Sequence, residues 1–288
     1  MANWMGLVAE VLRTGLIGAH IGRSRFAAAL DLFCAQFGLR LEFELLDSAQ
    51  TPGFDFEACV HRLREAGWTG VSVTHPFKPR AAAYLGDALC PNVAQLGASN
   101  TLLFDPLTAY NTDHSGFLAA WRARMKDAVP GRVAMAGAGG VACALGPALK
   151  TLGATEILLW DVDPARATDL ADRIGPPARA IPLDQVSQAV RHADGLVNAT
   201  PLGMGTDPRA AFDLSALGPQ AWAFDAVYTP VWTPFLRAAR ASGLECLTGF
   251  ELFTHMALDS FCLYTGCSVD PALAHMLAPL EPKETLDA

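Results

Sequence analysis

Polar and charged side chains follow several short apolar runs in the first part of the chain, where loops would leave the C-terminal ends of strands. These residues are Ser24, Ser72, Thr74, Lys78, Asn100 and Asp113. Open α/β sheets bind their ligands at this end. A lysine serves as a general acid or base where burial lowers its pKa, and a nearby carboxylate can orient it. Such a pair suits proton transfer on a polyhydroxylated, mostly uncharged substrate. Taken singly, the lysine could instead be a solvated surface residue and the aspartate a helix N-cap.

A glycine-rich turn lies between two further apolar runs. The run from Val133 to Ala136 precedes it, an alanine-rich helical stretch follows it, and the second run ends on Asp161. This order predicts strand, tight turn, helix and strand with the spacing G-x-G-x-x-A, which is typical of dinucleotide-binding folds. The diphosphate would bind the N–H groups of the helix N-terminus, where the helix dipole is positive. The residues expected to contact it are Gly137, Ala138, Gly139, Gly140 and Val141.

The acidic residue that ends the second run predicts which dinucleotide binds. The carboxylate of Asp161 can bind both ribose hydroxyls, and Asp163 adds a second negative charge in the same loop. A 2′-phosphate about 4 Å from a carboxylate would be repelled by roughly 1 kcal/mol in water and about 4 kcal/mol at an effective dielectric of ~20. We therefore expect NAD as the cofactor. Arg166, one helical turn further on, is the residue that could weaken this preference, unless it lies over the adenine or in solvent.

Composition and length narrow the class of protein. The 288 residues suffice for two domains, and 51% hydrophobic against 17% charged residues is typical of a well-buried globular protein. The net charge of −8 and the scattered basic residues argue against nucleic acid or an anionic membrane surface as a partner. No uncharged run reaches the roughly 20 apolar residues that span a bilayer, and the first residues do not resemble a signal peptide. We expect a cytoplasmic monomer or homodimer.

Neither the cysteines nor the histidines are spaced as metal ligands. The seven cysteines include no C-x-x-C pair, and most lie in apolar helical patterns, which indicates free buried thiols in a reducing compartment. His20, His75 and His114 lie near the polar loops, but their spacing fits no set of metal ligands. We expect no metal site.

The first part of the chain alternates predicted strands with predicted helices. Residues 14–21 form a strand that ends in a glycine turn, 39–45 form a half-buried alternating strand, and 70–74 form a third strand. Apolar residues at helical spacing predict helices from Ser24 to Gly38 and from Asp55 to Gly67. This alternation predicts a mostly parallel sheet with helices on both faces.

A second series of strands and helices follows a predicted helix at roughly 116–127 and the Pro130-Gly131 break. We expect an α/β protein with two domains. A substrate-binding catalytic domain spans residues 1–114 and is completed by C-terminal helices within 251–288, because the amphipathic stretch 251–264 cannot extend the second sheet. A Rossmann-type dinucleotide-binding domain spans residues 115–250. Its later elements are predicted helices at 164–174, 185–191 and 233–242 and strands at 195–198 and 223–227.

Beyond these patterns, the sequence resembles the shikimate/quinate dehydrogenase family along nearly the whole chain. The motifs of the first part are V-T-H-P-F-K at 73–78, G-A-S-N-T at 97–101 and N-T-D at 111–113. Those of the second part are G-A-G-G at 137–140, N-A-T-P-L-G-M at 198–204, D-A-V-Y at 225–228 and T-P at 233–234. The V-T-x-P-F-K and N-T-D motifs together are specific to the family.

The resemblance implies an NAD(P)-dependent oxidation of a ring hydroxyl to a ketone, on a small cyclic hydroxy acid. Lys78 and Asp113 match the family's catalytic pair, and Tyr228 matches a tyrosine beside the nicotinamide and the substrate. Val162 stands where NADP-dependent relatives carry an arginine, which supports NAD. Positions that match substrate-binding residues are Ser24, Thr74 and Asn100. Positions within the cofactor-domain motifs that we expect to contact the dinucleotide are Asn198, Thr200, Pro201 and Val227.

Three positions depart from the family pattern. The first loop usually carries a second hydroxyl residue where this chain has Phe26, which also fits the apolar face of its helix. Met256 replaces a substrate-binding glutamine, and Ser72 replaces a more usual asparagine. Each lost charge-assisted hydrogen bond would cost about 1.5–3 kcal/mol. Either the ligand is bulkier or less polar on that side, and Met256 contacts it, or Arg23 and Arg25 bind the carboxylate, unless both arginines lie on the surface.

Three functions follow from these observations. The leading one is an NAD-linked dehydrogenase of shikimate or quinate type. The second keeps this chemistry on a related polyol or an amino-substituted ring. The third is a non-catalytic sensor that binds a quinate-like effector, against which the intact Lys78, Asp113 and Asp161 argue.

Overall fold

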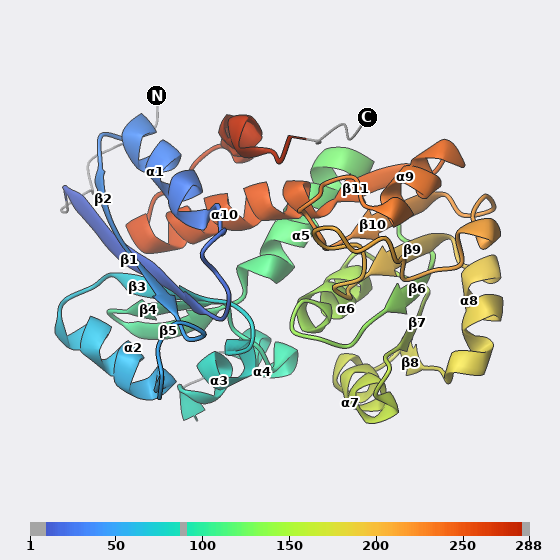
Figure 1. Ribbon diagram of the computed structural model, residues 1–288, viewed down its shortest axis with the longest axis horizontal. Coiled ribbons are helices and arrows are strands. Elements are labelled where there is room, and N and C mark those ends of the chain that lie inside the picture. The colour runs from blue at the N-terminus through green and yellow to red at the C-terminus, as the bar shows by residue number, and fades with distance from the viewer. Residues whose placement is uncertain (1–9, 87–90, 284–288) are drawn as a thin grey trace. The chain divides into compact units, whose positions relative to one another are not determined.

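The computed structural model describes residues 10–86 and 91–283, which fold into two compact α/β units (Figure 1). The first unit contains the described residues up to Ser115 together with Thr254–Leu280. The second contains Gly116–Phe253 and the described residues after Leu280. The two units divide the long helices α5 (Thr112–Met125) and α10 (Gly249–Thr265) between them. The α/β class with two sheets, expected from the sequence, is confirmed.

The sheet of the first unit is mixed. Its strand order is β2-β1-β3-β4-β5, with parallel pairing from β2 through β3 and antiparallel pairing from β3 through β5. In the antiparallel part, β4 runs against β3 and forms a hairpin with β5 across Asp105 and Pro106. The short strand β5 was not apparent in the sequence. The strands are β1 (Val11–Gly18), β2 (Arg40–Asp47), β3 (Gly70–Val73), β4 (Thr101–Phe104) and β5 (Leu107–Tyr110).

Helix α2 packs on one face of this sheet. It begins after Asp55, whose Oδ1 accepts the Ala58 N–H at 3.1 Å, as its predicted cap should. Its buried residues Phe56, Val60 and Leu63 join the strands in one apolar core. The helices of this unit, besides its parts of α5 and α10, are α1 (Phe26–Gln36), α2 (Phe56–Glu65), α3 (Lys78–Ala83), α4 (Pro91–Leu96) and the 3₁₀ helix η4 (Pro271–Leu280).

Helices α1 and α10 cover the opposite face, as Figure 1 shows. Phe261 of α10 lies between two aromatic residues of the α1 region, with ring centroids 5.5 Å from Phe33 and 5.3 Å from Phe37. Aromatic pairs at this separation add about 0.5–1.5 kcal/mol beyond the burial of their area. The C-terminal part of α10 is therefore an integral part of the first unit, far as it is from that unit in sequence.

The sheet of the second unit is parallel throughout, in the order β11-β10-β9-β6-β7-β8. Its two edge strands were not predicted, because they are short and lack the apolar runs that mark the central strands. The strands are β6 (Arg132–Ala136), β7 (Glu156–Trp160), β8 (Ala178–Ala180), β9 (Gly195–Asn198), β10 (Trp222–Asp225) and β11 (Glu245–Thr248). The helices are α6 (Ala142–Thr151), α7 (Pro164–Ile174), η2 (Leu183–Gln185), α8 (Val186–His192), η3 (Leu214–Ala216) and α9 (Pro234–Ala241).

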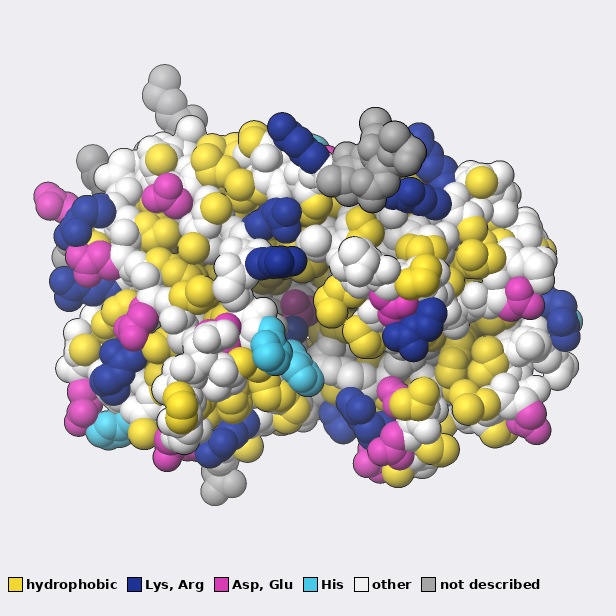
Figure 2. Space-filling view, viewed as in Figure 1, with side chains coloured by type: hydrophobic (Ala, Val, Ile, Leu, Met, Phe, Trp, Pro, Cys, Tyr) yellow, Lys and Arg dark blue, Asp and Glu magenta, His cyan; other side chains and the backbone are white. Residues whose placement is uncertain are grey.

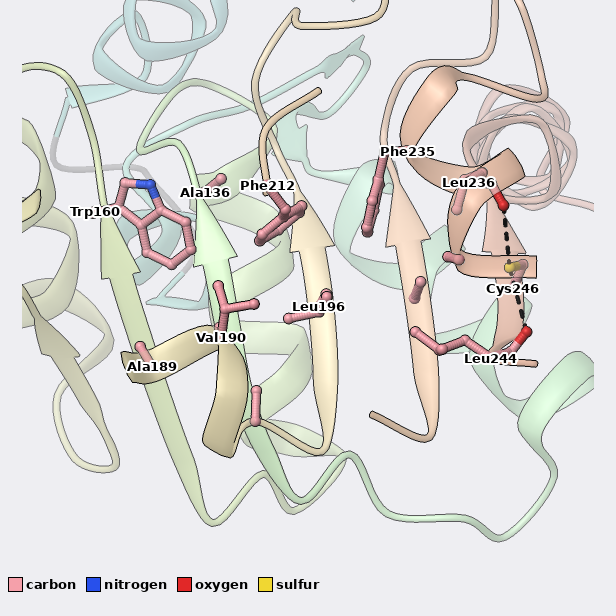
Figure 3. Close-up of a cluster of buried hydrophobic side chains, with 14 of the residues drawn as sticks. Ala136, Trp160, Ala189, Val190, Leu196, Phe212, Phe235, Leu236, Leu244 and Cys246 are labelled. Atoms are coloured by element: carbon pink, nitrogen blue, oxygen red, sulfur yellow. Dashed lines mark hydrogen bonds between the residues drawn. The ribbon is translucent and has the colours of Figure 1, made fainter. Parts of the chain in front are cut away.

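An apolar cluster fills one face of this second sheet (Figure 3). The Phe212 ring lies between Trp160 and Phe235, at centroid distances of 5.9 and 4.6 Å. Cys246 closes the cluster at the β11 end, where its Sγ lies 3.5 Å from the carbonyl oxygen of Leu244. Burial raises the pKa of Cys246 to about 11, so its thiol stays protonated at neutral pH.

The six cysteines within the described residues are all free thiols. They are Cys34, Cys59, Cys143, Cys246, Cys262 and Cys267, whereas Cys90 lies outside the described residues. Within residues 10–86 and 91–283, no helix is long and apolar enough to span a bilayer. In the same ranges, His, Cys, Asp and Glu side chains form no group that could hold a metal ion. Acidic and basic side chains are interspersed on the face shown in Figure 2.

Candidate active site

Lys78 and Asp113 form a close ion pair in the first unit. Lys78 is the first residue of α3, and Asp113 lies in the first turn of α5. The Lys78 Nζ is 2.5 Å from the Asp113 Oδ2, and the two side chains are only 13% and 10% exposed. Shielding from water strengthens the attraction between the charges and holds the geometry. The structure thus brings together the two residues that we predicted from sequence to exchange and orient a proton.

The segment between β3 and α3 fixes the lysine. Thr74 extends β3 by donating its N–H to the Ile17 carbonyl at 2.8 Å, and its own carbonyl accepts the Phe77 N–H at 2.9 Å. The Phe77 ring stacks on Phe56 of α2, at a centroid distance of 5.4 Å and an interplanar angle of 15°. The residue directly before Lys78 is therefore anchored in the core, and the lysine leaves a rigid turn.

Asn100 holds the other partner. Its Oδ1 accepts the Thr112 N–H at 2.8 Å, and the hydroxyls of Thr112 and Thr101 each lie 3.1 Å from the same atom. These contacts fix the N-terminus of α5 one residue before Asp113. Asn100 is 5% exposed, and its Nδ2 donates no hydrogen bond within the described part of the chain, so that group is free to bind a substrate oxygen.

The first loop, which carries Ser24, is held by an aspartate that the sequence analysis missed. Both carboxylate oxygens of Asp47 bind backbone N–H groups, with His20 at 2.9 Å, Ile21 at 3.0 Å and Ala49 at 3.0 Å. Desolvation acts to raise the pKa of Asp47, but these N–H donors outweigh it and leave the pKa below its ordinary value. An aspartate at the end of the alternating run 39–45 was the signal available in the sequence.

The first loop also lies against the loop after β3. The Ala19 N–H donates to the His75 carbonyl at 2.9 Å. A Cβ on Gly18 would lie 2.3 Å from the Thr74 Cγ2, so this close approach requires glycine. The half-buried Ser24 and Thr74 therefore belong to adjoining loops at the carboxyl ends of β1 and β3, as the sequence predicted.

Phe26 does not belong to the site surface. It is 3% exposed, and its ring packs edge-on against Phe43 at a centroid distance of 6.2 Å. Phe26 is therefore a core residue. Its N–H donates to the Ser24 Oγ at 3.2 Å, which orients that hydroxyl. Of the two neighbouring arginines, Arg23 is exposed and Arg25 half-buried.

Ser72 has a different environment from the one we expected. It is buried in β3, and its Oγ shares a 2.7 Å hydrogen bond with the hydroxyl of Tyr264 in α10. Burial raises the pKa of Tyr264 to about 12, so the tyrosine remains protonated. The Ser72 hydroxyl therefore serves the contact between sheet and helix, and we interpret Ser72 as a support for α10 in place of the predicted substrate contact.

Met256 lies on α10 beside the start of α5. Its Sδ is 3.9 Å from the Oγ of Ser260, and that Oγ is 3.0 Å from the Thr112 Oγ1. The thioether is thus close to the residue that precedes Asp113. It is half-buried and offers only a weak hydrogen-bond acceptor at this place.

The glycine turn of the second unit has the form that a dinucleotide requires. Gly137 has φ +97°, and a Cβ on it would lie 2.9 Å from the backbone of Ala199. A Cβ on Gly139 would meet only the Arg166 Nη2, at 3.8 Å, so the backbone there is open to a ligand. Ala142, at the start of α6, is fully buried, as expected of the small residue where helix and strand pack. These residues fit the diphosphate of a dinucleotide.

Asp161 at the end of β7 ties this turn to the next loop. Its Oδ2 accepts the Ala138 N–H at 2.8 Å, and its Oδ1 accepts the Asp163 N–H at 3.0 Å. Asp163 in turn caps α7 through the Ala165 N–H at 3.0 Å. Val162 between the two aspartates is 91% exposed. The carboxylate of Asp161 is therefore held at the edge of the turn, and no cationic side chain occupies the adjoining position 162.

Asn198 shapes the loop that faces the glycine turn. Its Oδ1 accepts from the Thr200 N–H at 2.9 Å and from the Thr200 hydroxyl at 2.6 Å, and its Nδ2 donates to Asp225 at 2.9 Å. Asn198 is fully buried, so it shapes the loop that contains Thr200 and the exposed Pro201 and offers no surface of its own to a ligand. Val227, the last member of this predicted set, is buried and donates its N–H to Asp225 at 3.0 Å.

Asp225 is a residue of the D-A-V-Y motif whose role the sequence did not reveal. Its Oδ2 accepts the hydroxyl of Thr233, the N-cap of α9, at 2.7 Å. Burial raises the pKa of Asp225 to about 6, while the hydrogen bonds from Thr233, Val227 and Asn198 act in the opposite direction. Tyr228 ends the motif three residues later, and its ring stacks on Phe253 at a centroid distance of 5.3 Å.

Two features together define a class of protein. One α/β unit has a glycine turn with a terminal carboxylate, and the other has a shielded lysine–aspartate pair. This combination is that of two-domain NAD(P)-linked oxidoreductases that act on CH–OH groups. Comparisons with known proteins support this class. Residues 16–102 match the family model of the shikimate dehydrogenase substrate binding domain. The chain is 36% identical over 266 residues to a quinate/shikimate dehydrogenase (NAD⁺) of Corynebacterium efficiens, covering 89% of this chain and 93% of that protein. It is 37% identical over 277 residues to a shikimate dehydrogenase (NADP⁺) of Streptomyces avermitilis, covering 92% and 94%.

Solved structures agree with the sequence relatives. The quinate dehydrogenase of Corynebacterium glutamicum in complex with NAD matches with a TM-score of 0.87 and 33% identity, covering 93% of this chain and 99% of that chain. The shikimate 5-dehydrogenase of Thermus thermophilus in complex with NADP(H) and shikimate matches with a TM-score of 0.82 and 33% identity, covering 94% and 100%. The chain belongs to the shikimate/quinate dehydrogenase family.

Proposed function

We propose that this protein is an NAD-dependent dehydrogenase that oxidises a ring hydroxyl of shikimate, quinate or a closely related cyclic hydroxy acid to the ketone. The observation that carries the proposal is the shielded Lys78–Asp113 pair, with Nζ and Oδ2 2.5 Å apart, in a chain of this family. The first unit would bind the substrate, and the second would bind the dinucleotide through its glycine turn.

Residues of the first unit would accept the proton of the substrate hydroxyl. In the oxidation direction Lys78, in its amine form, takes the hydroxyl proton at Nζ while Asp113 holds that nitrogen in place. The dinucleotide, held by the glycine turn, would supply the acceptor for the hydride of the carbinol carbon. The C–H and O–H bonds break, a C=O bond forms, and the proton remains on Lys78. The Nδ2 of Asn100 and the hydroxyl of Thr74 would bind other oxygens of the ring.

The loop after β7 supports NAD over NADP. A 2′-phosphate would meet the carboxylate of Asp161 and a neutral, exposed Val162. Relatives of similar identity carry either cofactor in their names, so the residues of this loop are the better guide. We expect kcat/KM to favour NAD⁺ by roughly 10- to 1,000-fold, which corresponds to the electrostatic repulsion of about 1–4 kcal/mol.

A substitution in the same loop tests the reason for this preference. Val162→Arg places a cation beside the expected position of a 2′-phosphate, and the exposed side chain can change without disturbing the core. The variant should raise kcat/KM for NADP⁺ by about fivefold, the equivalent of one exposed ion pair of ~1 kcal/mol, whereas Val162→Gln should not. Comparable kcat/KM for NAD⁺ and NADP⁺ in the unmodified protein would contradict the proposed cofactor.

Met256 favours a second candidate substrate. Its thioether offers no strong donor or acceptor close to the Thr112–Asp113 segment. A ring polyol or amino-substituted ring that is less polar on this side would leave no group desolvated and unpaired there. The chemistry at Lys78 would be the same for this substrate.

A reduction screen decides between these substrates. The purified protein is mixed with NAD⁺ and, in turn, shikimate, quinate, related ring acids and neutral ring polyols, and NADH formation is followed. Turnover of a ring acid in the unmodified protein and its loss in Lys78→Ala would support the proposal. Binding of a ring acid without turnover would instead indicate a sensor.

A further inference from the structure

Two buried hydroxyls join α10 to the start of α5 in the first unit. The Ser260 Oγ lies 3.0 Å from the Thr112 Oγ1, and it also lies 2.9 Å from the carbonyl oxygen of Met256 one turn earlier in α10. Ser260 is 0% exposed and Thr112 is 1% exposed.

The Thr112 hydroxyl lies between Asn100 and Ser260. The Oδ1 of Asn100 accepts the Thr112 N–H at 2.8 Å, and the hydroxyls of Thr101 and Thr112 each lie 3.1 Å from the same atom. The Thr112 Oγ1 also shares a 3.0 Å hydrogen bond with the Ser260 Oγ, which lies 2.9 Å from the Met256 carbonyl oxygen. The Thr112 hydroxyl therefore links the Asn100 amide to Ser260 of α10.

The carboxylate of Asp113 depends on this support. Within the described residues, Lys78 is its one side-chain hydrogen-bond partner. Its direction is therefore set by the backbone of the first turn of α5. That backbone is fixed from one side by Asn100, through the Thr112 N–H, and from the other by Ser260, through the Thr112 hydroxyl.

We propose that Ser260 is a positioning residue for the Lys78–Asp113 pair and acts through the hydroxyl of Thr112. This inference rests on the proposed dehydrogenase function, because the pair is the proton-transfer machinery of that reaction. Ser260 touches neither Lys78 nor Asp113 itself. Its loss removes the α10 partner of the Thr112 hydroxyl, lets the first turn of α5 shift, and loosens the alignment of Asp113 with the lysine.

Four variants test this role in the full-length protein. Ser260→Ala and Thr112→Val each remove one hydroxyl of the bridge, and the second keeps the shape of the side chain. Each should lower kcat about tenfold and leave the KM for NAD⁺ within twofold. Thr112→Ser keeps the hydroxyl and should retain most of kcat. Thr265→Val is the matched control, because Thr265 also donates to the carbonyl four residues earlier in α10, at 2.8 Å, but within the described residues its hydrogen bonds do not reach α5.

A double-mutant cycle with Asp113→Asn separates positioning from general damage. If Ser260 acts through Asp113, Ser260→Ala should have no further effect on kcat in the Asp113→Asn background. The inference would be overturned if the kcat reductions of the two single variants multiplied in the double variant. It would also be overturned if Ser260→Ala and Thr265→Val lowered kcat equally, or if Ser260→Ala had a normal kcat.

Crystal structures of the unmodified protein and of Ser260→Ala provide a readout that does not depend on activity. The Lys78–Asp113 contact should lengthen or become disordered in the variant, and an unchanged contact would overturn the positioning role. A protein that turns over none of the ring substrates would refute the proposed function, whereas the crystallographic comparison would still decide whether Ser260 positions Asp113.

Discussion

Lys78 is the residue on which the proposed chemistry depends most directly. Replacing it with alanine should lower kcat by about 10²- to 10⁴-fold, the range typical of losing a general acid or base. The KM for NAD⁺ should stay nearly normal, because the glycine turn and Asp161 belong to the other unit. Steady-state kinetics with a ring acid measure both quantities, and the exposed Lys283→Ala serves as control. A Lys78→Ala protein that retains more than about a tenth of the normal kcat would assign the lysine another role.

Met256 is the residue that bears on substrate choice. Met256→Gln should raise kcat/KM for shikimate about threefold if the new amide recovers only ~0.7 kcal/mol from a ring oxygen, and Met256→Leu should not raise it. The comparison needs steady-state kinetics at saturating NAD⁺. A lower kcat/KM in the glutamine variant, or a micromolar KM for shikimate in the unmodified protein, would show that the thioether is no obstacle.

Phe26 needs no such substitution. It departs from the family pattern as strongly as Met256 does, but its ring is part of the core against Phe43. Replacing a buried aromatic residue with a small one costs about 3–5 kcal/mol of stability. A polar residue at position 26 would therefore be expected to destabilise the fold before it could improve substrate binding.

At the scale of elements, a buried carboxylate joins β10 to α9. The pKa of Asp225 is raised from 3.8 to about 6 in the folded chain, chiefly by burial. The folded protein therefore takes up a proton between about pH 6 and pH 4 that the unfolded chain does not. This group adds stability as the pH falls through that window, by about 3 kcal/mol for a pKa difference of about 2.

Asp225→Asn should remove this pH dependence. The free energy of unfolding of the unmodified protein, relative to that of the variant, should increase by up to about 3 kcal/mol between pH 7 and pH 4. Denaturant unfolding at a series of pH values gives the two curves. Parallel curves would mean that Asp225 does not titrate in this window. Asp213→Asn is the matched control, because Asp213 is exposed and hydrogen bonds lower its pKa.

At the scale of the whole molecule, NAD⁺ and NADP⁺ should stabilise the folded protein to different extents. A ligand that binds only the folded state stabilises it by about 2.7 kcal/mol at 100 times its Kd. NAD⁺ should therefore raise the melting temperature by several degrees, in the unmodified protein and in Lys78→Ala alike, whereas NADP⁺ at the same concentration should raise it much less. Differential scanning fluorimetry measures the shift. An equal shift with NADP⁺ would count against the role proposed for Asp161 and Val162.

Much of the architecture was available from local patterns. Long apolar runs marked the central strands, and a side-chain cap with a closing glycine marked α2, because burial periodicity and capping act within a few residues. The strands β5, β8 and β11 escaped notice since each has only three or four residues and depends on its neighbours for pairing. The same hairpin that contains β5 makes the first sheet mixed, where the alternation of strands and helices suggested mostly parallel pairing.

The sequence by itself determined the family and the candidate site residues, because motifs such as V-T-H-P-F-K and N-T-D combine residue type with fixed spacing. Only the tertiary structure decided which of these side chains meet. It paired Lys78 with Asp113 across 35 positions, and it used the Ser72 hydroxyl for Tyr264, 192 positions away. It also recruited Asp47 and Ser260, which no motif marks. Hydrogen bonds between distant segments depend on how strands order and helices pack, and one-dimensional spacing does not contain that information.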